Sequence, residues 1–133
     1  MNGVFLDTVG LIAVWDASDQ WHAAAEAAFS ELLRDNVPLL TTNYVLLECG
    51  NAASRRPYRR LVTALRAQLR DAGLLVDPTD EELEAAWLAY DRGEAGEAAI
   101  VDHVSFAVMR RLGLKRAFTN DGHFLAAGFE TCW

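Results

Sequence analysis

Short apolar runs alternate with segments of helical pattern along the chain, and this alternation limits the possible folds more than any other feature of the sequence. The runs have the length and hydrophobicity of buried strands. We expect strands at residues 4–6, 39–41, 74–76 and 116–119, and a short last one at 129–131. Strands separated by helices form a parallel sheet that is covered on both faces. The sequence therefore predicts an α/β fold around a central parallel sheet.

Turn and capping residues set the bounds of the helices between these strands. We expect helices at about 9–15, 21–35, 44–54, 57–72, 79–90 and 102–112. Candidate N-cap residues are Thr8, Ser18 or Asp19, Thr42 or Asn43, and Thr79. Thr79 with Glu82 is a capping-box pattern, Pro57 suits a first helical turn, and Gly113 suits a helix end. The segment 93–97, rich in glycine and acids, is expected to be a loop.

The bulk composition is that of one soluble domain. The chain has 133 residues, of which 52% are hydrophobic and 23% charged, so we expect a single domain over 1–133 with a core of its own. No apolar run approaches the roughly 20 residues that a membrane helix needs. The start of the chain lacks a basic region typical of a secretion signal. Cys49 and Cys132 form no CxxC pattern, which favours a reducing cytoplasm over a disulfide framework.

The net charge of −7 argues, taken alone, against a nucleic-acid partner. The distribution of the basic residues weakens that objection, because ten of the twelve fall in two segments. The first segment contains Arg55, Arg56, Arg59, Arg60, Arg66 and Arg70, and the second contains Arg110, Arg111, Lys115 and Arg116. These basic residues can lie on solvent-exposed helix faces, or they can bind phosphates around an acidic centre. We expect RNA-phosphate contacts, if they exist, from Arg55, Arg56, Arg59 and Arg60.

Four acidic residues stand where the predicted fold brings them to one edge of the sheet. Asp7 directly follows the first strand, and Asp121 lies two residues beyond Thr119, at the end of the fourth. Ligands of parallel sheets gather outside the carboxyl ends of the strands. Glu48 and Asp102 lie on helical segments with apolar neighbours, where a buried carboxylate is costly unless a positive charge meets it. Taken singly, each acid can be a helix cap, a turn residue or a half-exposed helix residue; only their joint placement indicates a site.

Four carboxylates without a basic residue nearby in the sequence favour a divalent cation. Hard oxygen ligands suit Mg²⁺ or Mn²⁺, and such a cation can orient a phosphate and activate water for attack. The three histidines lack the spacing of a zinc site. We expect His103 and His123 to serve packing or to lie at the surface, with a minor role in positioning substrate as the alternative, since each flanks one of the acids. Glu97 is expected to be a solvated loop acid rather than a ligand.

Four sequence blocks resemble the motif blocks of PIN domains, and most closely those of VapC-like toxins. They occur in the order of the family and together extend over nearly the whole chain. The blocks are Phe5-Leu6-Asp7-Thr8, residues 41–48 (TTNYVLLE), residues 102–109 (DHVSFAVM) and residues 118–124 (FTNDGHF).

The resemblance implies a three-layer α/β/α sandwich and a magnesium- or manganese-dependent endoribonuclease. It implies that Asp7, Glu48, Asp102 and Asp121 are the catalytic and metal-binding acids. Supporting polar residues would be Thr8, Thr119 and Asn120. It further implies an RNA substrate, a homodimer, and a cognate antitoxin that silences the toxin.

The chain departs from the family pattern just before the third acid. Two hydroxyl residues that the family often carries there are replaced by Ala99 and Val101. This leaves open a second function, a catalytically weak PIN module that acts through protein binding. A third class, phosphoryl transfer through an aspartyl nucleophile, is disfavoured because Asp7-Thr8-Val9 lacks a second acid two residues after the first.

Overall fold

A four-stranded parallel sheet forms the centre of the computed structural model, which describes residues 2–133. The strands are β1 (Val4–Leu6), β2 (Leu39–Leu40), β3 (Arg116–Phe118) and β4 (Glu130–Thr131), in the order β2-β1-β3-β4. In the central pair, Val4 aligns with Arg116 and Leu6 with Phe118. The carboxyl ends of β1 and β3 are therefore adjacent, which is what the expected site requires.

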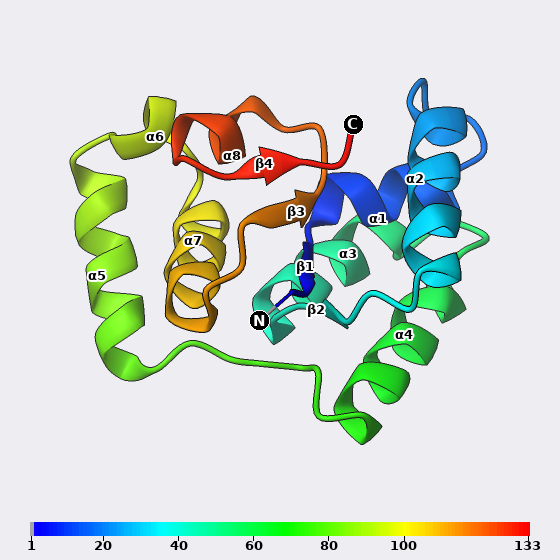
Figure 1. Cartoon of the computed structure of the whole chain (residues 1–133), viewed down its shortest axis with the longest axis horizontal. Helices are drawn as coiled ribbons and strands as arrows, with labels where there is room; N and C mark the ends of the chain where they lie inside the picture. Colours follow the sequence, from blue (N-terminus) through cyan, green and yellow to red (C-terminus); the bar gives the residue numbers. More distant parts are fainter. Residues whose placement is uncertain (1) are drawn as a thin grey trace.

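Eight helices within residues 2–133 connect and cover the strands (Figure 1). They are α1 (Thr8–Trp15), α2 (His22–Arg34), α3 (Asn43–Ala53), α4 (Arg59–Asp71), α5 (Asp80–Asp91), α6 (Glu94–Glu97), α7 (Ile100–Leu112) and α8 (Gly122–Ala126). Helix α5 packs along α7 on one side of the sheet. Helices α2 and α4 lie on the opposite side of the strands in Figure 1. The predicted α/β/α arrangement around a parallel sheet is confirmed.

The core is built from the strands and the inner faces of the helices around them. All three residues of β1 are fully buried, as a strand inside a parallel sheet should be. Phe118 on β3 and Phe106 on α7 are also buried, and Phe106 meets Phe124 edge-to-face with ring centroids 4.9 Å apart. Within residues 2–133, every helix is too short or too polar to cross a bilayer.

Several expected bounds were wrong by a few residues, and one expected strand is reduced to a single bridge. Residues 74–76 touch the sheet only where Leu75 pairs with Thr41. The Thr41 N–H donates to the Leu74 carbonyl, and Val76 N–H donates to the Thr41 carbonyl. The chain then leaves the sheet edge at Asp77-Pro78, since proline cannot donate to a ladder.

The caps are partly as expected. Thr42 accepts from Val45 N–H, and Thr79 with Glu82 forms the predicted capping box. Gly113 ends α7 with φ 68°, as predicted. Pro57 precedes α4 rather than lying in its first turn, and α2 begins at His22, after a turn that Asp19 closes.

Two short helices replace segments expected to be irregular. The segment 94–97 is the single turn α6, in which Ala95 and Glu97 have positive φ. The segment after Asp121 is α8, and Asp121 caps it by accepting from His123 N–H. Of the local roles open to Asp121, a helix cap is the one that the structure shows, and this places His123 beside the acid.

Candidate active site

The structure gathers the four acids, Asp7, Glu48, Asp102 and Asp121, at the carboxyl edge of β1 and β3; we refer to them as the acid cluster. Asp7 follows β1 and is the N-cap residue of α1, and Asp121 follows β3 and is the N-cap residue of α8. Asp102 lies in the first turn of α7, and Glu48 lies in the middle of α3. The parallel register of β1 with β3 brings the first pair together, and the two helices bring the second pair to it.

Asp7 is the most deeply buried member of the acid cluster. It is 2% exposed, and its Oδ2 atom has no hydrogen-bond partner among residues 2–133. Burial, and then the negative charges of Asp102 and Asp121, raise the pKa of Asp7 to about 7, although polar contacts with Thr119 and the Thr8 backbone oppose that rise. A buried carboxylate that has lost its hydration is unfavourable when ionised, and a bound cation would stabilise it.

Asp102 is in a similar but less extreme environment. Burial raises its pKa to about 6, and the negative charges of Asp121 and Glu48 act in the same direction. The ligand atoms of Asp102, Asp121 and His123 all lie within 4.8 Å of one another, close enough to share one ion. The mutual repulsion shows that the acids act on one another electrostatically and are not scattered over separate surfaces.

Hydroxyl groups hold two of the acids in position. Thr8 was expected as a helix cap, but Asp7 occupies that position and the Thr8 hydroxyl donates to Glu48 Oε1 at 2.7 Å. The buried Thr119 hydroxyl accepts from the Asp121 N–H at 3.1 Å. Asn120 is half-buried, and its side chain makes no hydrogen bond within residues 2–133. Two of the three expected supporting residues therefore contact the acid cluster or its backbone.

His123 is in direct contact with the acid cluster, although packing or a surface location was expected for it. Its Nδ1 lies 2.7 Å from Asp121 Oδ1, and this contact raises the pKa of the imidazole. The two side chains meet because Asp121 is the N-cap residue of α8 and His123 lies in the first turn of that helix.

The predicted phosphate-binding arginines lie away from the acids, around the link from α3 to α4. Arg56 forms an ion pair with Asp16 at 2.8 Å, and Arg59 donates to the Ser54 carbonyl. Arg55 and Arg60 are exposed. Within the part of the chain that the structure describes, none of these arginines pairs with a member of the acid cluster.

The ligand atoms that the acid cluster offers suit a divalent cation. It offers carboxylate oxygens, one of which is buried and unpartnered on Asp7. Across residues 2–133 no lysine or arginine forms an ion pair with these acids, and His123 is the sole side chain of basic type that contacts them. Buried carboxylates without a cationic partner are unfavourable, and oxygen donors of this kind suit Mg²⁺ or Mn²⁺.

Cys49 is buried, and burial raises the pKa of its thiol to about 12. It is therefore a neutral thiol at physiological pH and packs as a small hydrophobic residue.

The start of α7 lacks a capping side chain. Ala99 is the N-cap residue, has the extended backbone of a cap, and provides no side-chain hydrogen bond. Ala99→Ser should let a hydroxyl accept from a backbone N–H of the first turn and raise the free energy of unfolding by about 1 kcal/mol. Urea denaturation of the two proteins measures this difference, and Ala23→Ser in the first turn of α2, where no N-cap is replaced, is the control. An unchanged or lower midpoint for Ala99→Ser would contradict it.

This arrangement of a parallel sheet with four acids at its carboxyl edge is that of a PIN domain. The chain belongs to the PIN domain family, whose model matches residues 4–130. It is 34% identical over 128 residues to the 23S rRNA-specific endonuclease VapC20 of Mycobacterium tuberculosis, from strains CDC 1551 / Oshkosh and ATCC 25618 / H37Rv, with 95% of each chain covered. The expected resemblance to VapC-like PIN domains is confirmed.

Two solved structures are similar over nearly the whole chain. The crystal structure of Mycobacterium tuberculosis VapC20, a sarcin-ricin loop cleaving toxin, matches with a TM-score of 0.77 and 33% identity over 96% of each chain. FitAcB from Neisseria gonorrhoeae matches with a TM-score of 0.63 and 19% identity, over 96% of this chain and 95% of that one. The second likeness concerns the fold alone.

Proposed function

We propose that this protein is a metal-dependent endoribonuclease and the toxin of a toxin–antitoxin pair. The observation that carries the proposal is the convergence of the acid cluster, which includes the buried Oδ2 of Asp7 that has no hydrogen-bond partner within residues 2–133. The relationship to an rRNA-specific endonuclease at 34% identity supports the choice of RNA as substrate and makes ribosomal RNA the first candidate.

In this proposal each member of the site has a stated task. Asp7, Asp102 and Asp121 hold Mg²⁺ or Mn²⁺, and Thr8 keeps the Glu48 carboxylate directed at the same place. A cation of this kind, when bound, polarises the scissile phosphate and lowers the pKa of water. Thr119 fixes the backbone at Asp121, and His123 holds the Asp121 carboxylate through Nδ1. Burial of Asp7 keeps bulk water from competing for its oxygens.

RNA would also be bound by positive charge around the link from α3 to α4, away from the acid cluster. We assign phosphates farther along the strand from the scissile one to Arg55, Arg56, Arg59 and Arg60, which would position the strand without reading its sequence. Arg56 is already paired with Asp16, so Arg55 and Arg60 have the freer side chains. Binding should then weaken as salt concentration rises.

The protein partners belong to the same proposal. Exposed apolar side chains on α3 and α4, such as Leu47 at 66% exposure and Leu61 at 47%, offer a surface for an antitoxin. We also place the single domain in the cytoplasm as a homodimer. Size-exclusion chromatography with light scattering tests the dimer.

The proposed activity is tested by incubating purified protein with 23S rRNA and Mn²⁺. Cleavage should require the metal, stop with EDTA and resume when Mn²⁺ is restored. It should be lost in Asp121→Asn and retained in Asp71→Asn, since Asp71 is an exposed residue at the end of α4. Cleavage that persists in EDTA or in Asp121→Asn would overturn the proposal.

The alternative function is a catalytically weak PIN module that acts by binding a protein. Ala99 and Val101 favour it, because neither supplies a hydroxyl beside Asp102. This alternative predicts no cleavage of any RNA and no measurable Mn²⁺ binding by calorimetry. Metal binding together with cleavage that depends on Asp121 would exclude it.

A further inference from the structure

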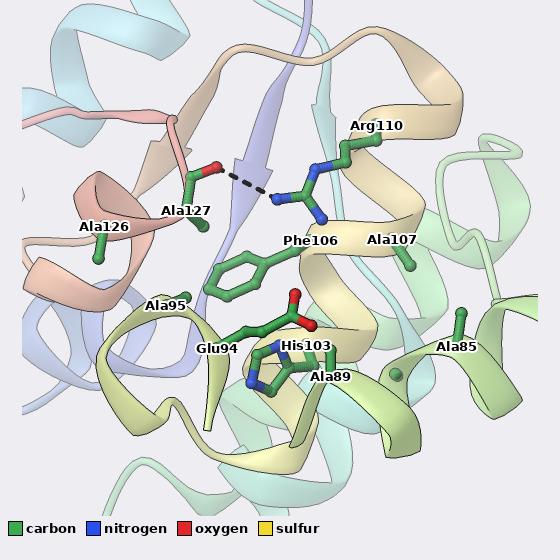
Figure 2. Close-up of a pocket in the computed structure, with 11 residues that line it drawn as sticks. Ala85, Ala89, Glu94, Ala95, His103, Phe106, Ala107, Arg110, Ala126 and Ala127 are labelled. Carbon is green, nitrogen blue, oxygen red and sulfur yellow. Dashed lines mark hydrogen bonds between the residues drawn. The ribbon is translucent and has the colours of Figure 1, made fainter. Parts of the chain in front are cut away.

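A small pocket lies beside the acid cluster, enclosed by α5, α6, α7 and α8 (Figure 2). Its volume is about 220 Å³, which is below the roughly 300 Å³ at which pockets for drug-sized ligands begin. Alanines form much of its wall, among them Ala89 on α5, Ala107 on α7 and Ala127 after α8. The pocket therefore combines small apolar side chains with the polar side chains of Glu94, His103 and Arg110, in a volume that suits a small ligand.

An arginine is fixed at one side of this pocket. Arg110 donates through Nη2 to the Ala127 carbonyl at 3.2 Å. Its guanidinium packs against the rings of Phe106 and Phe129, with distances of 5.9 Å and 5.4 Å to the ring centroids. One hydrogen bond uses only part of the donor capacity of a guanidinium. Arg110 is thus held in place with N–H groups free to meet an acceptor.

A carboxylate reaches into the same pocket from α6. Glu94 lies between Phe106 and His103 in Figure 2 and makes no ion pair with Arg110, or with another residue of 2–133. His103 also lines the pocket, is 4% exposed, and has a buried Nε2 that finds no hydrogen-bond partner in the described part of the chain. The pocket therefore combines a positive donor, a negative acceptor and an unpartnered imidazole nitrogen.

The backbone that carries Glu94 is strained. Ala95 and Glu97 adopt φ of 54° and 60°, in the left-handed region that non-glycine residues avoid. Such strain persists where the surrounding structure requires it and is concentrated at functional sites. A Cβ built on Gly96 would lie 3.7 Å from His123 Cδ2. Helix α6 therefore connects the pocket with the acid cluster.

We propose that this pocket binds a guanine base extruded from the RNA next to the scissile phosphate. The proposal rests on the proposed nuclease function and names the base that the site reads. An extruded base is held by apolar or aromatic walls and by hydrogen bonds to its edges. Guanine alone among the four RNA bases offers two adjacent donors, N1–H and N2–H, for one carboxylate such as Glu94. It also offers the O6 and N7 acceptors that arginine prefers.

The other bases do not match both groups. Adenine and cytosine present an unprotonated ring nitrogen where the Glu94 carboxylate needs a donor, and uracil presents a single N–H. A correct bidentate pair discriminates by about 1–3 kcal/mol, which is roughly 5- to 150-fold in affinity.

The first experiment measures base binding without cleavage. Guanosine, adenosine, cytidine and uridine 5′-monophosphates are titrated into the ¹⁵N-labelled metal-free protein. The guanosine nucleotide should shift the amide signals of Ala89, Ala107 and Ala127, and should bind at least about fivefold more tightly than the other three. Glu94→Gln should remove this preference, because an amide nitrogen would face the N1–H donor. The control Glu84→Gln makes the same charge change on an exposed part of α5 and should keep it.

A second variant fills the pocket without changing charge. Ala89→Leu should abolish the guanosine-dependent shifts while circular dichroism and the melting temperature show a folded protein. Equal responses to all four nucleotides, or a guanine preference that survives Glu94→Gln, would overturn the proposal. No response to any nucleotide would also overturn it. A side chain of a partner protein would then be favoured over a base as the group that binds in the pocket.

The second experiment reads the cut sites in a randomised RNA library with Mn²⁺. Guanine should be enriched at one fixed position near the cut, and Glu94→Gln should reduce this enrichment together with the rate of cutting at guanine-containing sites, whereas Glu84→Gln should change neither. Cleavage without any guanine preference would overturn the pocket proposal and leave the nuclease function standing. Absence of cleavage would count against the nuclease function, and the nucleotide titration would still decide for or against the pocket.

Discussion

Asp7→Asn should abolish metal-dependent cleavage, with a loss of about 100-fold or more in rate. Asparagine keeps the shape of the side chain but removes the negative charge from the most buried member of the acid cluster, whose Oδ2 has no partner within the described residues. The substitution should also reduce Mn²⁺ affinity measured by calorimetry. Asp71→Asn, on the exposed end of α4, is the matched control and should behave like the wild type.

The same substitution should stabilise the metal-free protein at neutral pH. Burial raises the pKa of Asp7 from 3.8 to about 7, a shift that corresponds to roughly 4 kcal/mol. The folded state binds this proton more tightly than the unfolded state, so the contribution of Asp7 to the free energy of unfolding is most favourable at low pH and decreases as the pH rises from about 4 to about 7. Above pH 7 the ionised Asp7 opposes folding with its full effect, unless a cation neutralises it.

Melting curves in EDTA between pH 5 and pH 8 measure this effect. The wild type should lose stability relative to Asp7→Asn as the pH rises, and at pH 8 the variant should melt higher by roughly 5 °C or more. Millimolar Mn²⁺ should raise the melting temperature of the wild type and leave the variant nearly unchanged. Parallel pH profiles in EDTA would show that Asp7 carries no such penalty.

Gly10→Ala should destabilise the fold by about 3 kcal/mol or more, above the usual range for an overpacked core. Gly10 lies on α1, where the helix crosses β3, and a Cβ there would lie 2.1 Å from the Phe118 carbonyl oxygen and 2.6 Å from Phe118 Cδ2. The carbonyl cannot move away freely, because it accepts from the Asp7 N–H at 3.4 Å. Either α1 shifts or the end of β3 does, and both carry members of the acid cluster.

The matched control for this prediction is Gly50→Ala. Gly50 lies inside α3, and a Cβ there would meet nothing within 4 Å. Alanine is favoured over glycine in a helix, so this variant should gain about 0.5–1 kcal/mol. Urea denaturation of both variants measures the contrast. A small loss for Gly10→Ala, comparable with the change in Gly50→Ala, would show that α1 does not pack on β3 as closely as the structure has it.

The sequence predicts those parts of the site that depend on local pattern. Asp7 and Asp121 can be located because each follows an apolar strand, and the carboxyl ends of parallel strands meet. Glu48 and Asp102 can be located because carboxylates among apolar neighbours need a partner. The resemblance to PIN domains joins these four into one site. In the structure Asp102 and Asp121 are close enough to share an ion, the charges of both act on Asp7, and the charge of Glu48 acts on Asp102.

The remaining features depend on contacts between distant residues. The Thr8 hydroxyl bonds Glu48 across 40 positions, so the sequence shows only a plausible cap. His123 joins the site because α8 begins directly after Asp121. Glu94 and Arg110 share a pocket only because α6 turns back through strained residues. The strand expected at residues 74–76 is reduced to one bridge for a local reason. Pro78 lacks an N–H and prevents the pairing with the sheet from continuing.

The central claim is that the acid cluster is one cation site, and anomalous diffraction from crystals soaked in Mn²⁺ tests it most directly. We expect a manganese peak bounded by the carboxylates of Asp7, Asp102 and Asp121. This peak should disappear in crystals of Asp7→Asn. A map without a peak among these side chains at millimolar Mn²⁺, or a peak that remains unchanged in the variant, would contradict it.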